Sequence, residues 1–345
     1  MSKKKKITLW TLLVLLLLGA GGAYWGWRTY LQPNVDLQGK RSEFIFVRTG
    51  WTMDELVDML EEKQLIKDRK SFEQAAAIKK FTVPKPGRYR IEDGMSNRKL
   101  VNMLQAGLQE PVQFTFTGLR TKAELVRRVG RKLEADSSAL LFMLNDNTFL
   151  SRYGFNSATV MTMFIPSTYE FYWNTSAEEF IERMAKEYKA FWTEERKAKA
   201  KAAGLTQSQV VILASIVQAE QTTYNDEKPV IAGLYINRLR KRMALQSDPT
   251  LIYAIGDFSI RRVLNSDKEI DSPYNTYKHA GLPPGPINIP EISSIEAVLN
   301  YKKSDYLYMC ARYGSGRHAF TSDYNVHMAN AKAYREALDK ANINR

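Results

Sequence analysis

The longest apolar stretch of the chain lies close to its first residue. Residues 7–27 carry no charge, and four consecutive lysines, residues 3–6, precede them. About 20 apolar residues cross a bilayer as a helix, and lysines beside such a helix stay on the cytoplasmic side. The pattern predicts a cytoplasmic tail at 1–6, a single-pass anchor at 7–30 in the inner (cytoplasmic) membrane, and an exported remainder.

A cleaved signal peptide is the alternative, because residues 19–23 are small. The apolar core of a signal peptide spans about 7 to 15 residues, fewer than this stretch offers. A retained anchor is therefore favoured. No cysteine lies near the segment, which excludes lipoprotein processing.

After the anchor, short segments with the hydrophobic period of a strand alternate with segments that have the period of a helix. They predict a polar connector at 31–43, a strand at 44–47, helices at 52–60 and 72–78, a strand at 86–91 and a helix at 96–104. Thr52 can cap the first helix, and Gly107 is a natural stop for the last. This order predicts a small α+β unit.

The rest of the chain predicts a larger domain of mixed helices and strands. Its segments are a strand at 112–116, a helical region at 121–153, an irregular and partly exposed stretch at 163–173, and a long charged helix at 176–203. The predicted fold class is α+β, with an N-terminal transmembrane helix, a small α+β subdomain and a larger mixed α/β domain.

Composition limits the classes of function. A chain of 345 residues that is 44% hydrophobic can form about two globular units beyond an anchor. Its one cysteine, Cys310, lies in an apolar strand-like run, which predicts a buried, inert thiol and excludes an intramolecular disulfide. The net charge of +13 suits anionic partners such as phospholipid headgroups or acidic wall polymers, whereas the predicted export argues against nucleic acid.

One predicted helix carries a carboxylate in an apolar setting. Thr206 and Gln209 form a capping box, residues 210–217 are apolar on nearly every face, and Glu220 projects from the same stripe. Because burial disfavours charge, the pKa of Glu220 should exceed the ordinary value of about 4.3, which suits a general acid. The alternative is a structural pairing with an interior arginine.

Polar and aromatic loops follow this helix. Residues 245–253 place an amide, a hydroxyl, a carboxylate and a phenol around a proline-led helix start, where Asp248 could serve only as an N-cap. Residues 272–277 and 281–287 form a rigid loop rich in Tyr, Asn and Pro. Such loops are typical of sugar-binding clefts.

Five motifs occur in order along this region: LASIVQAE at 213–220, LYINRL at 234–239, LQSDPT at 245–250, YNTY at 274–277 and GLPPGPI at 281–287. Together they resemble the MltG-type endolytic murein transglycosylases of the YceG-like family. The resemblance extends back through FIPSTYEF at 164–171 into the small unit. It implies a LysM-like subdomain at 44–110 and a YceG-like catalytic domain at 111–345.

The resemblance also implies that Glu220 is the catalytic acid. Many relatives carry a second acid where this chain has Gln218, and the residue after His327 departs from the family pattern. The implied reaction cuts the β-1,4 bond between N-acetylmuramic acid and N-acetylglucosamine inside a glycan strand. Glu220 would protonate the leaving oxygen and then deprotonate the sugar's 6-hydroxyl, which closes on C1 and leaves a 1,6-anhydro end. Such cuts would terminate or trim nascent strands. The residues expected to bind the sugars are Gln246, Ser247, Asp248, Tyr253, Tyr274, Asn275 and Tyr277.

Neither a cofactor nor a metal is expected, because His279, His318 and His327 lack the spacing of metal ligands. The expected partners are peptidoglycan glycan strands, the cytoplasmic membrane and peptidoglycan synthases, with no nucleic acid. Two alternatives remain open. One is an anchored wall-binding scaffold without catalysis, and the other is a muramidase in which Asp248 positions water.

Overall fold

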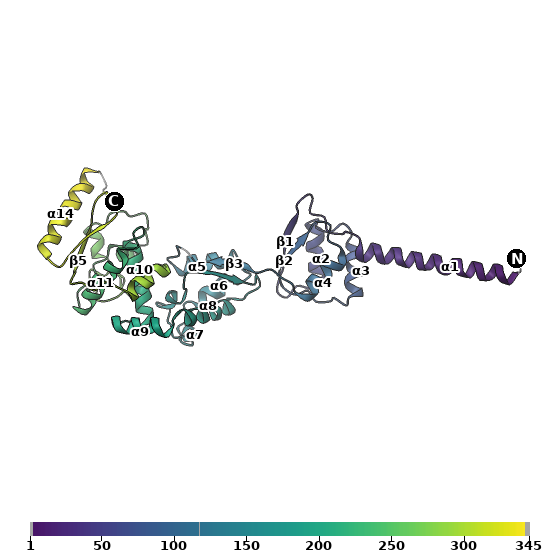
Figure 1. Cartoon of the computed structure of the whole chain (residues 1–345), viewed down its shortest axis with the longest axis horizontal. Coiled ribbons are helices and arrows are strands. Elements are labelled where there is room, and N and C mark those ends of the chain that lie inside the picture. Colours follow the sequence, from purple (N-terminus) through teal and green to yellow (C-terminus); the bar gives the residue numbers. More distant parts are fainter. Residues whose placement is uncertain (1–2, 117, 342–345) are drawn as a thin grey trace. The chain divides into compact units, whose positions relative to one another are not determined.

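The computed structural model describes residues 3–116 and 118–341 (Figure 1). It divides the chain into two compact units. The first unit holds the chain up to Gln113 together with residues 132–134 and 170–175, and the second holds the remainder. Both units combine helices with a short antiparallel sheet, so the predicted α+β class is confirmed.

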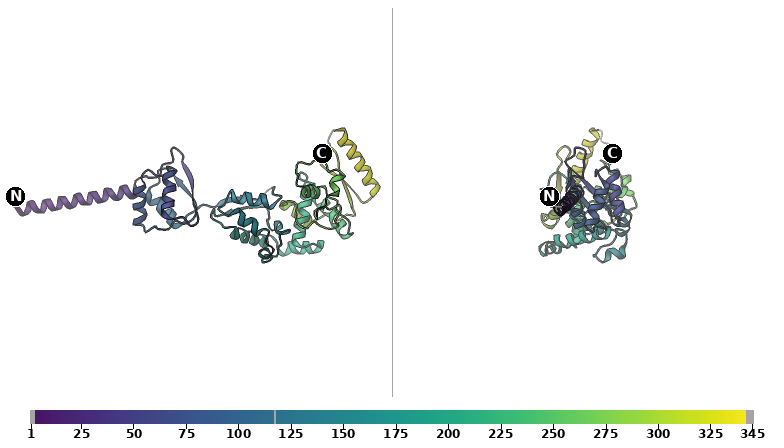
Figure 2. Two further views of the ribbon diagram at one scale, coloured as in Figure 1. Left: turned by 180° about the vertical axis from the view of Figure 1, so that it is seen from behind. Right: turned by 90° about the vertical axis from the view of Figure 1, so that its right-hand side faces the viewer.

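The chain begins with one long exposed helix (Figure 2). Helix α1 spans Lys3–Gly26 and continues as a π-helical turn, η1, over Trp27–Leu31. Residues Ile7–Leu31 are long and apolar enough to cross a membrane, and their apolar window has no part buried inside the protein. The predicted apolar segment is therefore a continuous helix with outward-facing side chains.

The first unit packs its helices and its sheet around one apolar core. Its elements are β1 Ser42–Val47, α2 Met53–Glu62, α3 Arg69–Ile78, β2 Gly87–Glu92 and α4 Asn97–Ala106. Strands β1 and β2 pair antiparallel, from Ser42 opposite Glu92 to Val47 opposite Gly87. Thr52 starts α2 with a capping box, as its spacing to Glu55 requires.

The structure corrects the predicted connector, because residues 33–37 are part of this core. Pro33 forms a β-bridge with Ser96, and Val35, which is fully buried, forms one with Ile66. Apolar side chains alternate with polar ones here, so one side of the segment faces the core. The anchor thus leads directly into the folded unit.

Short helices follow from β3 onward. The elements are β3 Val112–Thr115, α5 Lys122–Gly130, α6 Ser137–Met143, α7 Asn147–Ser151, η2 Val160–Met163, β4 Thr168–Phe171, α8 Ala177–Phe191 and α9 Glu194–Ala203. The helical region predicted at 121–153 thus consists of three short helices, and the single long helix predicted at 176–203 was wrong, because α8 and α9 divide that segment. The side chains of Asp136, Asp146 and Thr193 accept backbone N–H groups of the residues that follow them, and each starts a new helix.

Residues 163–173 are also more ordered than the sequence predicts. Phe164 is 1% exposed, and the segment continues into β4. The ring of Phe116 lies 5.7 Å from that of Phe164 and 5.5 Å from that of Tyr169, measured between centroids. The aromatic residues around Pro166 therefore build core packing, while residues 167, 168, 170 and 172 are exposed, so the predicted partial exposure holds but the segment is less irregular than expected.

The last part of the chain is built around a buried helix. The elements are α10 Gln207–Glu220, α11 Lys228–Arg240, α12 Asp248–Ile255, η3 Ser266–Glu269, α13 Ile292–Leu299, β5 Tyr308–Ala311, β6 His318–Thr321 and α14 Tyr324–Lys340. Helix α10 packs against α11 and α13, and its residues Val210–Val217 are buried. Strands β5 and β6 form a hairpin on which α14 packs.

Candidate active site

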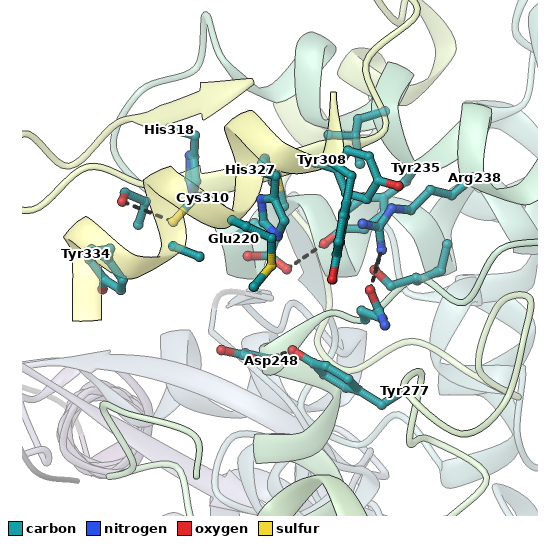
Figure 3. Close-up of a pocket in the computed structure, with 18 of the residues that line it drawn as sticks. Glu220, Tyr235, Arg238, Asp248, Tyr277, Tyr308, Cys310, His318, His327 and Tyr334 are labelled. Carbon is teal, nitrogen blue, oxygen red and sulfur yellow. Dashed lines mark hydrogen bonds between the residues drawn. The ribbon is translucent and has the colours of Figure 1, made fainter. Parts of the chain in front are cut away.

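A cavity of about 580 Å³ opens beside the end of α10. Its walls come from α10, α11, α12, the loop before α13, the β5–β6 hairpin and α14 (Figure 3). The polar groups that border it include Glu220, Asp248, Tyr277, His318 and His327. Segments more than a hundred residues apart in sequence thus meet around one space.

Glu220 is the last residue of α10, and its position follows from the way that helix begins and ends. Thr206 and Gln209 form the predicted capping box. At the far end, Oε1 of Glu220 accepts hydrogen bonds from the Tyr235 hydroxyl at 2.7 Å and from the Ser247 hydroxyl at 2.6 Å. Among the described residues no group donates to Oε2, so that oxygen is available to a ligand.

The pKa of Glu220 is raised. Burial is the main cause, and the negative charge of Asp248 adds to it, whereas the hydrogen bonds from Ser247 and Tyr235 and the nearby His318 oppose it. The interior arginine nearest to this region, Arg238, donates instead to the carbonyl oxygens of residues 244, 245 and 307. Within the described residues Glu220 has no ion pair, so the arginine-paired alternative is not realised.

Ser247 is held in place by the polypeptide behind it. It is 1% exposed and precedes α12 as its N-cap residue. Its backbone N–H donates to Oγ1 of Thr276 at 3.0 Å, and its carbonyl accepts from the hydroxyl of Thr250 at 2.7 Å. The hydroxyl that contacts Glu220 is therefore fixed by the loop and not by α10 itself.

Asp248 begins α12 and reaches the same cavity. The hydroxyl of Tyr277 donates to its Oδ1 at 2.5 Å. Burial raises the pKa of Asp248, and the bond from Tyr277 opposes that shift only in part. The cavity therefore holds a second acid with weakened acidity, on a different wall from Glu220.

The other predicted sugar-binding residues divide into two groups. Gln246 lines the cavity and its Oε1 accepts from Arg238 at 3.2 Å. The rings of Tyr253 and Tyr274 lie 4.8 Å apart between centroids and are tilted by 48°, and neither residue is among those of the described chain that line the cavity. Asn275 is fully buried, and its amide donates to the carbonyls of residues 268 and 270. Asn275 thus supports the loop instead of contacting a ligand directly.

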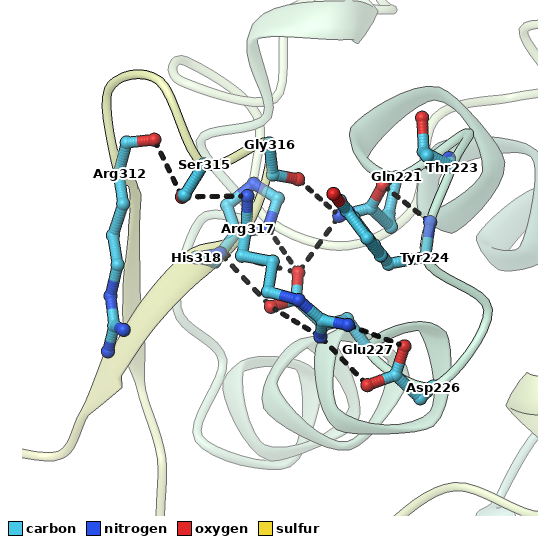
Figure 4. Close-up of polar contacts among 10 residues, drawn as sticks. All are labelled: Gln221, Thr223, Tyr224, Asp226, Glu227, Arg312, Ser315, Gly316, Arg317 and His318. Carbon is cyan, nitrogen blue, oxygen red and sulfur yellow. Dashed lines mark hydrogen bonds and ion pairs between the residues drawn. The ribbon is translucent and has the colours of Figure 1, made fainter.

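A pair at the edge of the cavity, the buried Glu227 and the cavity-lining His318, was missed by the sequence reasoning (Figure 4). Oε2 of Glu227 lies 3.0 Å from Nδ1 of His318 and accepts from Nε2 of Gln221 at 2.9 Å. Burial alone would raise the pKa of Glu227, but the hydrogen bonds from His318 and Gln221 outweigh it and lower that pKa. Because a carboxylate only accepts, Nδ1 of His318 carries its hydrogen toward Glu227 and Nε2 is the remaining ring nitrogen.

Charged neighbours complete this cluster. Arg317 forms a two-pronged ion pair with Asp226, at 2.8 and 3.3 Å, and lies 3.7 Å from Glu227. Gln221 also donates to the carbonyl of Gly316 at 2.9 Å, which ties the end of α10 to the β5–β6 turn. The residue next to Glu220 is therefore fixed from the opposite hairpin.

The wall formed by β5 and α14 corrects one prediction. Cys310 lies in a strand, as expected, but it is only partly buried and borders the cavity. Burial raises the pKa of its thiol. Next to it, the imidazole of His327 stacks on Tyr308 at 5.1 Å between centroids, and burial lowers the pKa of His327.

Gln218, which stands where many relatives have an acid, faces away from this chemistry. Its Oε1 accepts from the ammonium of the fully buried Lys228 at 3.2 Å and from the hydroxyl of Ser294. It is not among the described residues that line the cavity. Within the described part of the chain, no three His, Cys, Asp or Glu side chains gather as a metal site.

Comparisons with known proteins identify the family. The profile of the YceG-like family matches residues 45–333. The endolytic murein transglycosylase of Bacillus subtilis (strain 168) is 30% identical over 323 residues, which are 89% of this chain and 88% of that protein. The protein of that name from Streptococcus pneumoniae (serotype 2, strain D39) is 30% identical over 355 residues, covering 92% of this chain and 63% of its own length. A crystal structure of a YceG-like protein from Listeria monocytogenes is 27% identical with a TM-score of 0.56, over 84% of this chain and 99% of that one. The chain belongs to the YceG-like family.

Proposed function

We propose that this chain is an endolytic murein transglycosylase, which cuts the β-1,4 bond between N-acetylmuramic acid and N-acetylglucosamine within peptidoglycan strands. The observation that carries the proposal is Glu220, an acid with a raised pKa that borders a cavity and is held through one oxygen by Tyr235 and Ser247. Relatives that are 30% identical bear this name.

A single acid can perform both proton transfers of the reaction. Oε2 of protonated Glu220, free of donors among the described residues, gives its proton to the glycosidic oxygen as the bond from that oxygen to C1 breaks. The resulting carboxylate takes the proton of the sugar's 6-hydroxyl as O6 bonds to C1. The acid is regenerated, no water is consumed, and a 1,6-anhydro end is left. Hydrolases of the usual type need a second carboxyl group for the water or the sugar.

Tyr235 and Ser247 suit this alternation because both are neutral donors. Their hydrogen bonds to Oε1 stabilise the carboxylate once it forms, yet they bring no charge that would keep it permanently ionised. Burial raises the pKa of Tyr235 well above its ordinary value, so its hydroxyl remains a donor throughout. The pair holds the carboxyl group in one orientation for both steps.

Asp248, Tyr277 and Gln246 form the part of the wall that contacts the sugars. When ionised, Asp248 would stabilise the positive charge that develops at C1. Tyr253, Tyr274 and Asn275 support that wall from behind.

The Glu227–His318 pair positions the hairpin side of the cavity. Glu227 holds the imidazole in one orientation, and the ring contributes to the electrostatic field at Glu220. His318 is therefore a positioning residue in this scheme.

The architecture follows from the anchor. Helix α1 holds the chain in the cytoplasmic membrane with the lysines at 3–6 inside and both units outside. Residues 44–110, with three helices and the antiparallel pair of strands β1 and β2, form a LysM-like subdomain that holds glycan, and 111–345 form the catalytic domain. An enzyme placed there acts on strands as peptidoglycan synthases make them, and terminates or trims them.

The decisive experiment is mass analysis of the products from intact glycan strands. A transglycosylase gives 1,6-anhydro-muramic ends, lighter by about 18 Da than hydrolysed ends because no water is added. Internal cutting gives oligomers at early times. Reducing muramic ends as the sole product would assign the water-activating role to Asp248 and make the chain a muramidase. Binding without any cleavage would make it a wall-binding scaffold.

A further inference from the structure

A second cavity, of about 780 Å³, lies where the membrane anchor meets the first unit. Tyr30 and Leu31 at the end of the anchor form one side of it. Ile78 and Lys79 at the end of α3 and Arg98 in the first turn of α4 form the other. The cavity does not take part in the chemistry proposed above.

The walls of this cavity are fixed to one another by a buried polar network. The amide of Asn97 donates to the carbonyl of Thr29 in η1 at 2.9 Å and to the hydroxyl of Ser71 in α3 at 3.0 Å. The amide of Asn34 donates to Oδ1 of Asn97 at 2.7 Å. Asn34 and Asn97 are 4% and 1% exposed. These hydrogen bonds therefore hold η1, α3 and α4 together around the cavity.

The apolar side of the cavity faces outward. Leu31 is 49% exposed and Ile78 is 54% exposed, and both adjoin the end of the membrane-spanning segment. Tyr24, Trp25 and Trp27 lie on the same end of that segment, where aromatic side chains mark the interface between bilayer and water. The cavity thus lies at the level of the lipid headgroups.

Two cations on the other side have no carboxylate partner. Lys79 and Arg98 are exposed, and within the described residues neither has an acidic oxygen within 4.0 Å. Arg28, by contrast, lies 3.8 Å from Asp68. An unpaired lysine and arginine beside an apolar wall can bind a phosphate that carries an acyl chain.

We propose that this cavity binds the headgroup of an anionic phospholipid from the bilayer that holds α1. Lys79 and Arg98 contact the phosphate, while Tyr30, Leu31 and Ile78 contact the glycerol backbone and the first acyl carbons. The proposal rests on the membrane anchor described under the proposed function, but not on the identity of the reaction.

Native mass spectrometry of the full chain in detergent micelles tests the site, with phosphatidylglycerol or phosphatidylcholine as the added lipid. The wild type should retain phosphatidylglycerol preferentially. The double variant Lys79→Gln/Arg98→Gln should bind it roughly 30-fold more weakly, as expected for two cations close to an anionic surface. The matched control is Arg41→Gln/Lys63→Gln, which also removes one exposed arginine and one exposed lysine of the first unit but lies outside the cavity.

Equal retention of the two lipids by the wild type, or equal weakening in both double variants, would overturn the site. Recovery of the full chain from the soluble fraction without lipid would also overturn it. Glycan cleavage measured on the same preparations keeps the two proposals separate, because loss of lipid preference with normal cleavage contradicts only this one.

Discussion

Two glutamates at the ends of neighbouring helices, Glu220 and Glu227, have opposite tendencies toward protonation. The pKa of Glu227 is lowered, whereas that of Glu220 is raised, although burial acts to raise the pKa of both. Glu220 receives two hydroxyl donors on a single oxygen. Glu227 receives an imidazole, an amide and a backbone N–H and lies 3.7 Å from a guanidinium. The comparison teaches that burial favours the protonated form of both acids, and that the number and charge of the donors decide whether this effect is outweighed, as at Glu227, or prevails, as at Glu220.

Replacing Glu220, the proposed proton donor and acceptor, should have the largest effect on glycan cleavage. Glu220→Gln preserves the shape of the side chain but can neither give nor take a proton in the reaction. We expect glycan cleavage to fall by at least about 100-fold, while thermal unfolding stays close to that of the wild type. Near-normal cleavage by this variant would remove Glu220 from the mechanism.

Replacing Glu227, the acid with the lowered pKa, should mainly reduce the stability of the fold. Glu227→Gln replaces one accepting oxygen by an NH2 group, so the donors that bonded to that oxygen lose their acceptor. Each buried group left unpaired costs about 1–3 kcal/mol. Because the folded pKa of Glu227 is lowered, its charge stabilises the fold above the unfolded value of about 4.3, and this is lost as the pH falls toward the folded value. Urea unfolding at neutral and acidic pH should show the variant destabilised mostly at neutral pH. Asp226→Asn, which changes an exposed neighbour, is the control.

Removing the Ser247 hydroxyl, which donates to Glu220, should change the pH dependence of the cleavage rate. Ser247→Ala removes a hydrogen bond that lowers the pKa of Glu220, so that pKa should rise further. Since the acid must be protonated at the start, the alkaline limb of the cleavage rate should move to higher pH. The Ser247 side chain makes no capping bond, so α12 should remain intact. Ser259→Ala, at an exposed serine outside the cavity, should leave the profile in place.

Substitution of His318, which contacts Glu227 and influences the pKa of Glu220, should have the smallest effect. His318 is the weakest of the influences that lower the pKa of Glu220. In His318→Gln, a neutral amide can still donate to Glu227, so folding should survive. The alkaline limb should move in the same direction as in Ser247→Ala but by less. A lower rate with an unchanged profile would mean that His318 acts on the sugar and not on Glu220.

The features that the sequence predicts correctly depend on neighbours within one helical turn. The capping boxes at Thr52 and Thr206 each join residues three apart, and the apolar run before Glu220 is continuous in the chain. The breaks at Asp136, Asp146 and Thr193 are also local, but the helical period continues across them and conceals them. Local propensity therefore predicts the presence of a helix more reliably than the residues at which the helix begins and ends.

The residues that sequence reasoning missed are joined over long distances. Glu227 and His318 are 91 positions apart, and nothing near either residue indicates the other. Asn275 has the composition of a sugar-binding loop, but its amide turns inward to backbone carbonyls. The acidic residues Glu220 and Asp248 and the three histidines were visible in the sequence. Which of them face the cavity depends on how the β5–β6 hairpin and α14 close over α10 and α11.

The buried contacts of η1 join the end of the long apolar helix to the first unit. A membrane-spanning helix tilts when its apolar length exceeds the local hydrocarbon thickness. Asn97 donates to the carbonyl of Thr29, and Asn34 donates to Asn97, so in the proposed anchored state a change in the tilt of the helix would turn the first unit with it. The anchor would then act as a mechanical coupling as well as a tether.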